Sequence, residues 1–393
     1  MDTKVRTSGP AKARSATRKT VGEIAHQYDR VALVLQGGGA LGSYQVGVYQ
    51  ALAESGCEPS WISGVSIGAI NAALIAGNLP ERRMERLEAF WNLMSSRKVW
   101  HYTPEGDWFR DLRNQSSALM TMALGQPGFF KPQSVSPWLQ PRGAAGATSF
   151  YDSAELHDTL AELVDFDLLN NGEKRLSVGA VNVRTGNIVF FDSQKQRLGP
   201  EHIVASGALP PALSMVRIEG EHYWDGGIVS NTPLQYLLDQ EEDLSSLVFQ
   251  VDLFNARGEI PRQMSDVMTR QKDITYSSRT RQTTDAFKRI LALRMKLLDA
   301  LQRVPKAQLR PGEAELIEDY SDAGVVNIIH LIFQSKAYHG NAKDYEFSGT
   351  SMREHRQAGY EDTVRTLRHH DWLEPPDAHT GVTVHDLHRD DPV

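Results

Sequence analysis

Hydrophobic runs of strand length alternate with helical patterns along the first third of the chain. Residues 31–35 form a continuous apolar run that ends at a cluster of glycines, as expected of a buried parallel strand entering a tight turn. Residues 44–55 then place apolar side chains on one side of a helix. A short strand at 61–65 and an apolar helix at 67–76 follow. Because strands and helices alternate, the pattern predicts an α/β fold.

The middle of the chain continues this pattern after one irregular stretch. Between residues 100 and 150, Gly and Pro interrupt the periodicity, so we expect loops and short helices that cover a site. Regular patterning then predicts helices at 153–163 and 201–209 and strands at 176–183, 188–191, 215–218 and 247–253. These elements predict a three-layer sandwich with a mostly parallel central sheet flanked by helices.

The pattern divides the chain into three parts. Residues 1–28 carry scattered Lys and Arg without an apolar segment, so we expect a disordered basic tail. Residues 29–255 should form the α/β domain, with its sheet complete by about residue 255. Residues 256–393 should form a mainly helical C-terminal extension of unknown role. Its pattern predicts helices at 283–304 and 351–368 and one strand at 325–333.

The helix expected at 283–304 is locally basic, so it could lie on a membrane surface or act as a lid. Arg294, however, falls in the middle of its apolar stripe. We therefore favour packing of this helix within the protein.

Composition excludes several classes of protein. The net charge of -7 gives no reason to expect nucleic-acid binding, which usually requires a basic face. Cys57 is the only cysteine, so no intrachain disulfide can form and a cytoplasmic location is expected. The most apolar stretch, 64–77, is shorter than the ~20 residues of a membrane span, which predicts a soluble protein. Adjacent His369 and His370 lack carboxylate-rich spacing around them, so we expect no metal and no cofactor.

A G-x-S-x-G segment lies between the second expected strand and its following helix. It runs from Gly64 through Ser66 to Gly68. In this context the motif forms a nucleophile elbow, in which glycines two positions either side allow the close approach of neighbouring backbone. The turn points the serine hydroxyl outward at a helix N-terminus, where the helix dipole favours a developing oxyanion. Taken alone, the motif could also be an ordinary helix start.

A glycine loop follows the first expected strand. Gly37, Gly38, Gly39 and Gly42 let backbone N–H groups converge on negative charge. The loop also satisfies G-x-G-x-x-G, so a Rossmann-type dinucleotide-binding protein is the alternative. That alternative requires an acidic residue at the end of the second strand, where this chain has Ser66.

A third motif follows an aromatic pair near residue 224. Asp225 precedes Gly226 and Gly227, and a carboxylate on a glycine turn can approach a serine closely because no neighbouring Cβ blocks it. A general base must first be within reach of the proton that it accepts. The competing interpretation is a plain Asp-Gly turn.

The glycine loop, the elbow and the Asp-Gly-Gly motif follow one another along the chain in this order. In both content and order they resemble the motifs of the patatin-like phospholipase family. The resemblance covers about 31–255, including Asn231-Thr232-Pro233, and the part after 255 resembles the C-terminal extension of one bacterial branch. It implies a catalytic dyad of Ser66 and Asp225 without histidine, and an oxyanion hole formed by the backbone amides of residues 37–39. Many family members carry Lys or Arg where this chain has Leu41, which leaves headgroup preference open.

The sequence therefore predicts a serine esterase of lipase or phospholipase type that acts on lipids or other acyl esters. A Ser-His-Asp triad is the variant, with His157, His202 or His222 as the base, although each is more often an ordinary surface or loop residue. A catalytically silent lipid-binding module is the other alternative. Peripheral contact with a membrane or lipid surface is left open, and the oligomeric state is not predicted.

Overall fold

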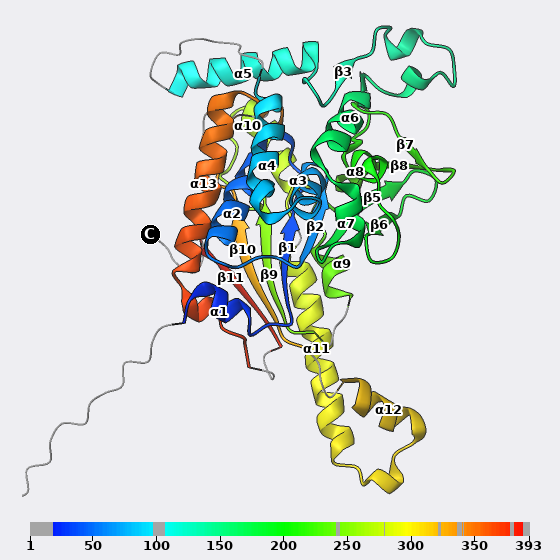
Figure 1. Cartoon of the computed structure of the whole chain (residues 1–393), viewed down its shortest axis with the longest axis vertical. Coiled ribbons are helices and arrows are strands. Elements are labelled where there is room, and N and C mark those ends of the chain that lie inside the picture. Colours follow the sequence, from blue (N-terminus) through cyan, green and yellow to red (C-terminus); the bar gives the residue numbers. More distant parts are fainter. Residues whose placement is uncertain are drawn as a thin grey trace, which may run out of the picture.

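The computed structural model describes residues 19–96, 107–240, 244–278, 280–320, 324–335, 340, 342–377 and 381–387. Within these residues, nine strands form one mixed sheet, and helices lie on both of its faces (Figure 1). The strand order is β11-β10-β9-β1-β2-β5-β8-β7, and β6 pairs with β5 beside this path.

The strands of this sheet are β1 (Arg30–Leu35), β2 (Trp61–Val65), β5 (Arg175–Asn182), β6 (Ile188–Asp192), β7 (Val216–Ile218), β8 (Glu221–Asp225), β9 (Ser246–Asp252), β10 (Val326–Ile332) and β11 (Val382–Asp386). A separate pair consists of β3 (Lys131–Pro132) and β4 (Tyr151–Asp152). The helices are α1 (Val21–Ala25), α2 (Ser43–Glu54), α3 (Ile67–Ala76), α4 (Pro80–Met94), α5 (Asp107–Leu124), α6 (Ala154–Leu163), α7 (Phe166–Asn171), α8 (Pro200–Gly207), α9 (Leu234–Leu238), α10 (Met264–Tyr276), α11 (Thr280–Gln302), α12 (Pro311–Tyr320), α13 (Gly349–Leu367) and α14 (His370–Leu373).

Parallel pairing in the centre of the sheet brings the candidate motifs to one edge. β1 pairs in parallel with both β2 and β9, and β2 pairs in parallel with β5. β6 and β8 run antiparallel to β5, and β7 runs antiparallel to β8. Since parallel strands end on the same side, the segments after β1 and β2 lie next to each other. Ligand sites in such sheets form outside the carboxyl ends of the strands.

The two faces of the sheet are covered by different helices. Along β1, Leu33 and Leu35 belong to the core cluster shared with α2, α3 and α4. Ala32 and Val34 belong to the cluster on the other face, with α9 and α11. The alternation follows from the two-residue period of a strand. The predicted three-layer sandwich with a mostly parallel central sheet is thus confirmed.

The sheet does not end at residue 255, so the expectation that it is complete there is wrong. β10 pairs in parallel with β9 along its whole length, and β11 pairs in parallel with β10. The residues of β10, Val326 to Ile332, are mostly buried. Without β10, β9 would be an edge strand with unpaired backbone hydrogen-bonding groups. The region after 255 is rich in helices, as predicted, but it also completes the central sheet.

Helix α13 ties the C-terminal region to the first helix after the glycine loop. A Cβ atom on Gly47 of α2 would lie 1.9 Å from the carbonyl oxygen of Arg356, and one on Gly359 of α13 would lie 2.0 Å from that of Tyr44. Only glycine permits so close a helix crossing at these two positions. The 29–255 segment therefore does not bury its core on this face without α13.

Two further expectations are corrected by helices. The region from 100 to 150 contains α5, which is 18 residues long, where we expected loops and short helices. Residues 100–106 of that region lie outside the described part. At the N-terminus, α1 falls within the expected disordered tail, because Thr20 and Glu23 form a capping box that starts it. Residues 1–18 of the tail lie outside the described part.

The basic helix expected at 283–304 is α11, and one of its faces packs within the protein. Leu291 and Leu298 are buried, and Phe287 packs against the core cluster of α9. The expected packing is thus confirmed for this face, while Leu293 and Leu297 on other faces are exposed. Figure 1 shows α11 leading away from the end of the molecule where α5 lies.

Candidate active site

Ser66 lies at the sharp turn between β2 and α3. Its backbone has φ 56°, a left-handed conformation that is rare for a residue with a side chain and that is typical of strained functional turns. The Ser66 N–H donates to the carbonyl oxygen and to Oγ of Ser206, both at 3.1 Å. The Ser206 hydroxyl in turn donates to the Gly179 carbonyl at 2.6 Å. The strained turn is therefore held by α8 and β5.

The turn leaves no room for side chains beside the serine. A Cβ on Gly64 would lie 2.4 Å from the Gly68 carbonyl carbon, and one on Gly68 would lie 2.3 Å from the Leu35 carbonyl oxygen. Both contacts are far shorter than real Cβ atoms permit, and both are to backbone. The elbow thus requires glycine at both positions, in agreement with the spacing of the motif.

Asp225 ends β8 and lies against Ser66. Its side chain is 2% exposed, and the Gly227 N–H donates to Asp225 Oδ1 at 2.7 Å. Burial raises the pKa of Asp225 to about 7, while the hydrogen bonds from the Gly227 N–H and the Ser66 side chain act in the opposite direction. The turn is tight, since a Cβ on Gly226 would lie 2.6 Å from the Gly179 carbonyl oxygen. The two residues, 159 positions apart, therefore meet.

The glycine loop reaches the same place, but only part of it is available to a substrate. The Gly37 N–H donates to the Asn231 carbonyl at 3.2 Å, and Asn231 Nδ2 donates to the Gly37 carbonyl at 3.1 Å. The prediction that the amide of Gly37 contributes to an oxyanion hole is therefore wrong for this structure. Within the described chain, no hydrogen bond is found from the N–H groups of Gly38 and Gly39, which begin a short 3-10 helix.

Two close contacts fix the far end of the loop. Gly39 has φ 54°, and a Cβ there would lie 2.3 Å from the Asp344 carbonyl oxygen. A Cβ on Gly42 would lie 2.5 Å from Ile67 Cγ1, at the start of α3. The loop is thus held between the elbow and the 3-10 turn Lys343–Tyr345, which comes from the region after 255.

A cavity of 140 Å³ contains these groups. Ser66, Asp225 and the three loop glycines lie on its wall, and most of the remaining wall is apolar or aromatic. The wall contributed from outside the three motifs consists of Phe129, Phe130, Tyr151, Gly207, Leu209, Ala212, Leu213, Asn231, Phe254, Lys272, Tyr276, Asp344, Tyr345 and Phe347. Such an arrangement suits the reacting end of an acyl chain.

Two family models match the chain. The model described as patatin-like phospholipase matches residues 33–238, just over half of the chain, and one described as patatin phospholipase matches residues 274–379. The chain belongs to the patatin-like phospholipase family. Membership of this family supports the predicted class of activity, a lipid acyl-ester hydrolase.

The solved structures that are similar to this chain have low sequence identity to it. VipD from Legionella pneumophila is 17% identical, with a TM-score of 0.39, over 87% of this chain and 67% of that one. Human GIVD cytosolic phospholipase A2 is 11% identical, with a TM-score of 0.43, over 90% of this chain and 62% of that one. This chain thus spans about two thirds of their length. No curated protein sequence matches the chain.

Leu41 does not line the cavity, and the cation on its wall comes from another element. Leu41 is fully buried in the core. Of the described residues on the cavity wall, only Lys272 of α10 is cationic, and it pairs with Asp344. Lys272, Asp344 and Tyr345 were missed from sequence, because they belong to no motif and lie outside the expected domain.

The three histidines proposed as alternative bases do not lie on the cavity wall. His157 is exposed on α6 beside Asp158, and His222 lies on β8 opposite Arg217. His202 is buried at the start of α8, where its Nδ1 accepts the Gly199 N–H at 2.9 Å, and burial lowers its pKa. The structure therefore does not support a Ser-His-Asp triad with any of the three.

The dinucleotide alternative is contradicted as well. A dinucleotide site would need an acidic residue at the end of β2, but Ser66 follows this strand. The acidic residues nearby form ion pairs or hydrogen bonds with other parts of the chain. Glu58 pairs with Arg83 and Lys174, both at 2.9 Å, and Glu54 accepts the Tyr360 hydroxyl at 2.7 Å. Among the residues that the structure describes, neither Glu54 nor Glu58 is thus positioned at the end of β2 to bind a ribose.

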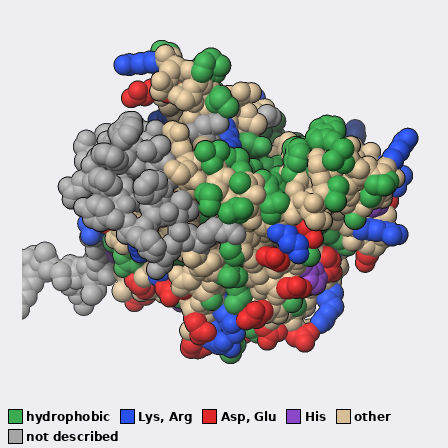
Figure 2. All heavy atoms as spheres, turned by 90° about the horizontal axis from the view of Figure 1, so that it is seen from above, with side chains coloured by type: hydrophobic (Ala, Val, Ile, Leu, Met, Phe, Trp, Pro, Cys, Tyr) green, Lys and Arg blue, Asp and Glu red, His purple; other side chains and the backbone are tan. Residues whose placement is uncertain are grey.

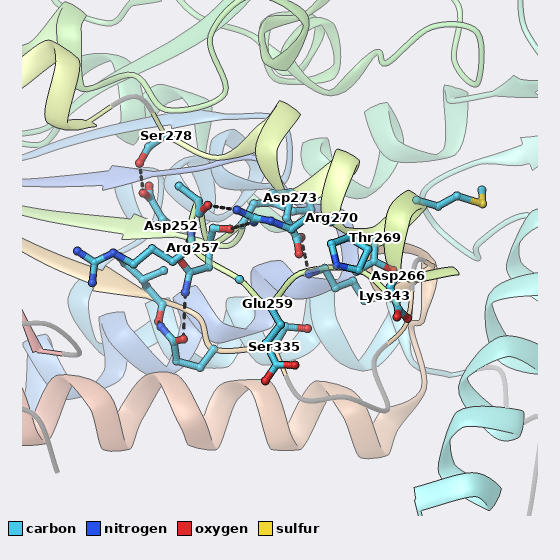
Figure 3. Close-up of a pocket in the computed structure, with 18 of the residues that line it drawn as sticks. Asp252, Arg257, Glu259, Asp266, Thr269, Arg270, Asp273, Ser278, Ser335 and Lys343 are labelled. Atoms are coloured by element: carbon cyan, nitrogen blue, oxygen red, sulfur yellow. Dashed lines mark hydrogen bonds and ion pairs between the residues drawn. The ribbon is translucent and has the colours of Figure 1, made fainter. Parts of the chain in front are cut away.

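A second, larger cavity of 1410 Å³ lies beyond α10, at the carboxyl ends of β9 to β11 (Figure 3). Polar and charged side chains dominate its wall. Asp252 accepts hydrogen bonds from Ser278 and from His330 Nε2, the latter at 2.6 Å. Lys343 pairs with Asp273 of α10 at 2.6 Å. The charged side of α10 thus faces this cavity and the turn at 343–345.

Among the described residues, no group of His, Cys, Asp and Glu side chains could hold a metal ion. A search of the same residues finds no helix with the length and hydropathy needed to cross a membrane.

Proposed function

We propose that the chain is a serine acyl-hydrolase that cleaves acyl esters of lipids, with Ser66 as nucleophile and Asp225 as general base. The observation that carries this proposal is the buried carboxylate of Asp225 in contact with the Ser66 hydroxyl, at the end of a strained elbow. Family membership supports the reaction class, and the contact supports the roles of these two residues.

In the proposed reaction, Asp225 accepts the Ser66 proton while Oγ forms a bond to the ester carbonyl carbon. The tetrahedral intermediate collapses, the bond to the alcohol oxygen breaks, and Asp225 returns its proton to the leaving alcohol. Water then attacks the acyl-enzyme, giving its proton to Asp225, and the released Ser66 oxygen takes that proton back. Each proton taken up is returned, so the cycle balances without a cofactor.

The environment of Asp225 supports this role. A carboxyl group with an ordinary pKa is a weak base at neutral pH, whereas burial brings the pKa of Asp225 to about 7. A pKa close to the working pH gives the best compromise between ionisation and basicity. The Gly227 N–H, at 2.7 Å, fixes the carboxylate toward the serine.

The proposed oxyanion hole consists of the backbone N–H groups of Gly38 and Gly39, assisted by the N-terminus of α3. Both glycines lie on the wall of the cavity beside Ser66. Their positions are held by Asn231, which bonds Gly37 through both its backbone and its side chain, and by the backbone of Asp344. Preorganised donors of this kind stabilise the charge that develops on the carbonyl oxygen.

A panel of purified lipids tests the proposal. Phospholipids, lysolipids, neutral glycerides and short-chain esters are incubated with the wild type and with Ser66→Ala, and released fatty acid is measured. We expect release by the wild type from at least one lipid class and none above background by the variant. A wild type that binds these lipids without hydrolysing any of them would instead identify a silent lipid-binding module.

A further inference from the structure

Helix α5 presents its apolar side to solvent. In its described half, Asn114, Ser117 and Thr121 are buried together with the small Ala118. The large apolar side chains point outward instead, and Leu119, Met120, Met122 and Leu124 are all exposed. A surface helix of a water-soluble protein normally has the opposite arrangement.

Helix α10 is reversed in the same way. Its charged side chains bind inward: Arg270 donates to backbone carbonyls of 255 and 256, Lys272 pairs with Asp344, and Asp273 pairs with Lys343. Figure 3 shows Arg270 and Asp273 on the side of the polar cavity. Met264, Val267, Met268 and Ile274 of α10 are exposed, as are Gln271 and Thr275, and Met268 also borders the polar cavity. The inward charges thus hold the helix with its apolar face toward water.

The segment between α5 and β4 adds two highly exposed apolar residues to this end of the molecule. Trp138 is 85% exposed and Leu139 is 79% exposed, at a short 3-10 turn. Figure 1 places α5, α10 and β3 at one end, and Figure 2, which looks onto that end, shows hydrophobic side chains gathered there. Trp is a preferred anchor at the boundary between water and lipid, because its ring is apolar and its N–H polar.

The apolar surface is continuous with the catalytic cavity. Phe129, Phe130 and Tyr151 line the cavity from the segment that carries Trp138, and Tyr276 lines it from α10. Tyr151 also donates to the Met122 carbonyl of α5 at 2.6 Å. The same segments therefore form the cavity wall on one side and the exposed surface on the other.

The charge of residues 114–150 favours an anionic lipid surface, although α10 also contributes the acidic Asp266. Residues 114–150 contain Lys131 and Arg142 and no Asp or Glu, in a chain where one residue in eight is acidic. Lys131 and Arg142 are both exposed. Cations near a membrane surface are attracted to anionic headgroups, and acidic side chains would be repelled.

We propose that the outward faces of α5 and α10, together with the turn at Trp138 and Leu139, form a lipid-docking surface that places the mouth of the catalytic cavity on an anionic membrane. The inference rests on the proposed function, since a lipid hydrolase must reach substrate that is packed in a bilayer. Docking through this surface lets an acyl chain pass from the bilayer into the cavity without exposure to water.

Flotation with vesicles tests the surface. Wild type is mixed with vesicles of phosphatidylcholine and phosphatidylglycerol in equal parts, or of phosphatidylcholine alone. The test variants are Trp138→Ser/Leu139→Ser and Leu119→Gln/Leu124→Gln. The matched control is Leu293→Gln/Leu297→Gln, which alters equally exposed leucines on α11, away from this end (Figure 1). Hydrolysis of a water-soluble short-chain ester and thermal unfolding are measured for every protein.

We expect wild type and the α11 control to float with the anionic vesicles. Each test variant should lose about tenfold or more of its partition coefficient, while soluble-ester hydrolysis stays within about twofold of wild type. Lys131→Gln/Arg142→Gln should weaken binding to the anionic vesicles by roughly fivefold per cation and leave binding to neutral vesicles unchanged.

Three results would contradict the proposed lipid-docking surface. The first is a wild type that does not float; the second is test variants that float like wild type. The third is a wild-type dimer that the Trp138 variant converts to a monomer without any vesicle binding, which would make the surface an interface between copies. A wild type that floats but cleaves neither soluble nor vesicle esters supports the surface and refutes the proposed function, so the two failures are distinguishable.

Discussion

Among the described residues, two serines lie against buried aspartates, and the surroundings of the two pairs differ. Ser66 contacts Asp225 at the end of β8, and Ser278 contacts Asp252 at the end of β9. The two carboxylates are almost equally inaccessible, at 2% and 1% exposure. Their partners differ, and this difference decides what each can do.

Asp252 is surrounded by donors. His330 donates at 2.6 Å, Gln250 Nε2 at 3.0 and 3.2 Å, and Thr232 at 3.4 Å, in addition to Ser278. Burial lowers the pKa of His330, but the charge of Asp252 and its hydrogen bond outweigh this, so the pKa lies above its ordinary value. The acceptor positions of Asp252 are therefore occupied by these donors.

Asp225 has no cationic partner among the described residues, and burial leaves its pKa at about 7. Its serine also lies on a strained turn beside open glycine amides, whereas Ser278 follows the C-terminal end of α10. Both pairs place a serine beside a buried carboxylate, so this contact alone does not distinguish them. On our proposal, catalysis also requires a carboxylate without a cationic partner, a serine on a strained turn and free amide donors beside it.

The largest expected effect is the loss of the base. Asp225→Asn should lower kcat/KM for a soluble ester by about 10³ to 10⁴, because the amide cannot accept the Ser66 proton. Steady-state kinetics check this. Retention of more than a tenth of wild-type activity would contradict the role of Asp225.

The next effect concerns the glycine loop. Gly39→Ala should lower kcat by about 10² to 10³, since the added Cβ would meet the Asp344 carbonyl at 2.3 Å and displace the N–H donors. Gly186→Ala is the matched control, because Gly186 also has a positive φ of 72° but has no atom near the added Cβ. If both variants keep wild-type kcat, the loop does not supply the donors.

A smaller effect is expected from pH. The active form requires an ionised Asp225, so kcat/KM should rise with pH and level off above a midpoint near 7. Between pH 7 and pH 5 it should fall by about fiftyfold. A profile that is flat over this interval would show that no group with this pKa controls the reaction.

The smallest effect on activity is expected at the second pair. Asp252→Asn leaves His330 buried without its counter-charge and should destabilise the fold by ~3 kcal/mol. Soluble-ester activity should stay within about tenfold of wild type. Denaturant unfolding and kinetics separate the two readouts, and a thousandfold loss of activity in a folded variant would make Asp252 part of the catalytic machinery.

The features that could be predicted from the sequence are those that depend on residues close together in the chain. The elbow, the glycine loop and the Asp-Gly-Gly turn are local motifs whose backbone demands are visible as glycines, and β1, β2 and α3 have clear hydrophobic patterns. The sequence could not show that Asn231 occupies the Gly37 N–H, because that bond joins residues 194 positions apart.

The region after 255 was the harder part. β11 is a short strand whose residues are mostly half-buried, so its sequence shows no clear strand pattern. Only its pairing with β10 in the structure identifies it. Lys272, Asp344 and Tyr345 reach the cavity only because α13 and β10 pack on the first half of the chain. The sequence also did not reveal α5, since glycines and prolines follow it and the large apolar side chains of its described half are exposed.

The central claim is that Ser66, and not Ser278, is the nucleophile. Labelling the wild type with a fluorophosphonate probe and mapping the modified peptide by mass spectrometry tests it most directly. We predict one adduct, on Ser66, with a labelling rate that falls at least a hundredfold in Asp225→Asn and is unchanged in Asp252→Asn. An adduct on Ser278 or another residue, or equal labelling of Asp225→Asn and wild type, would contradict the account.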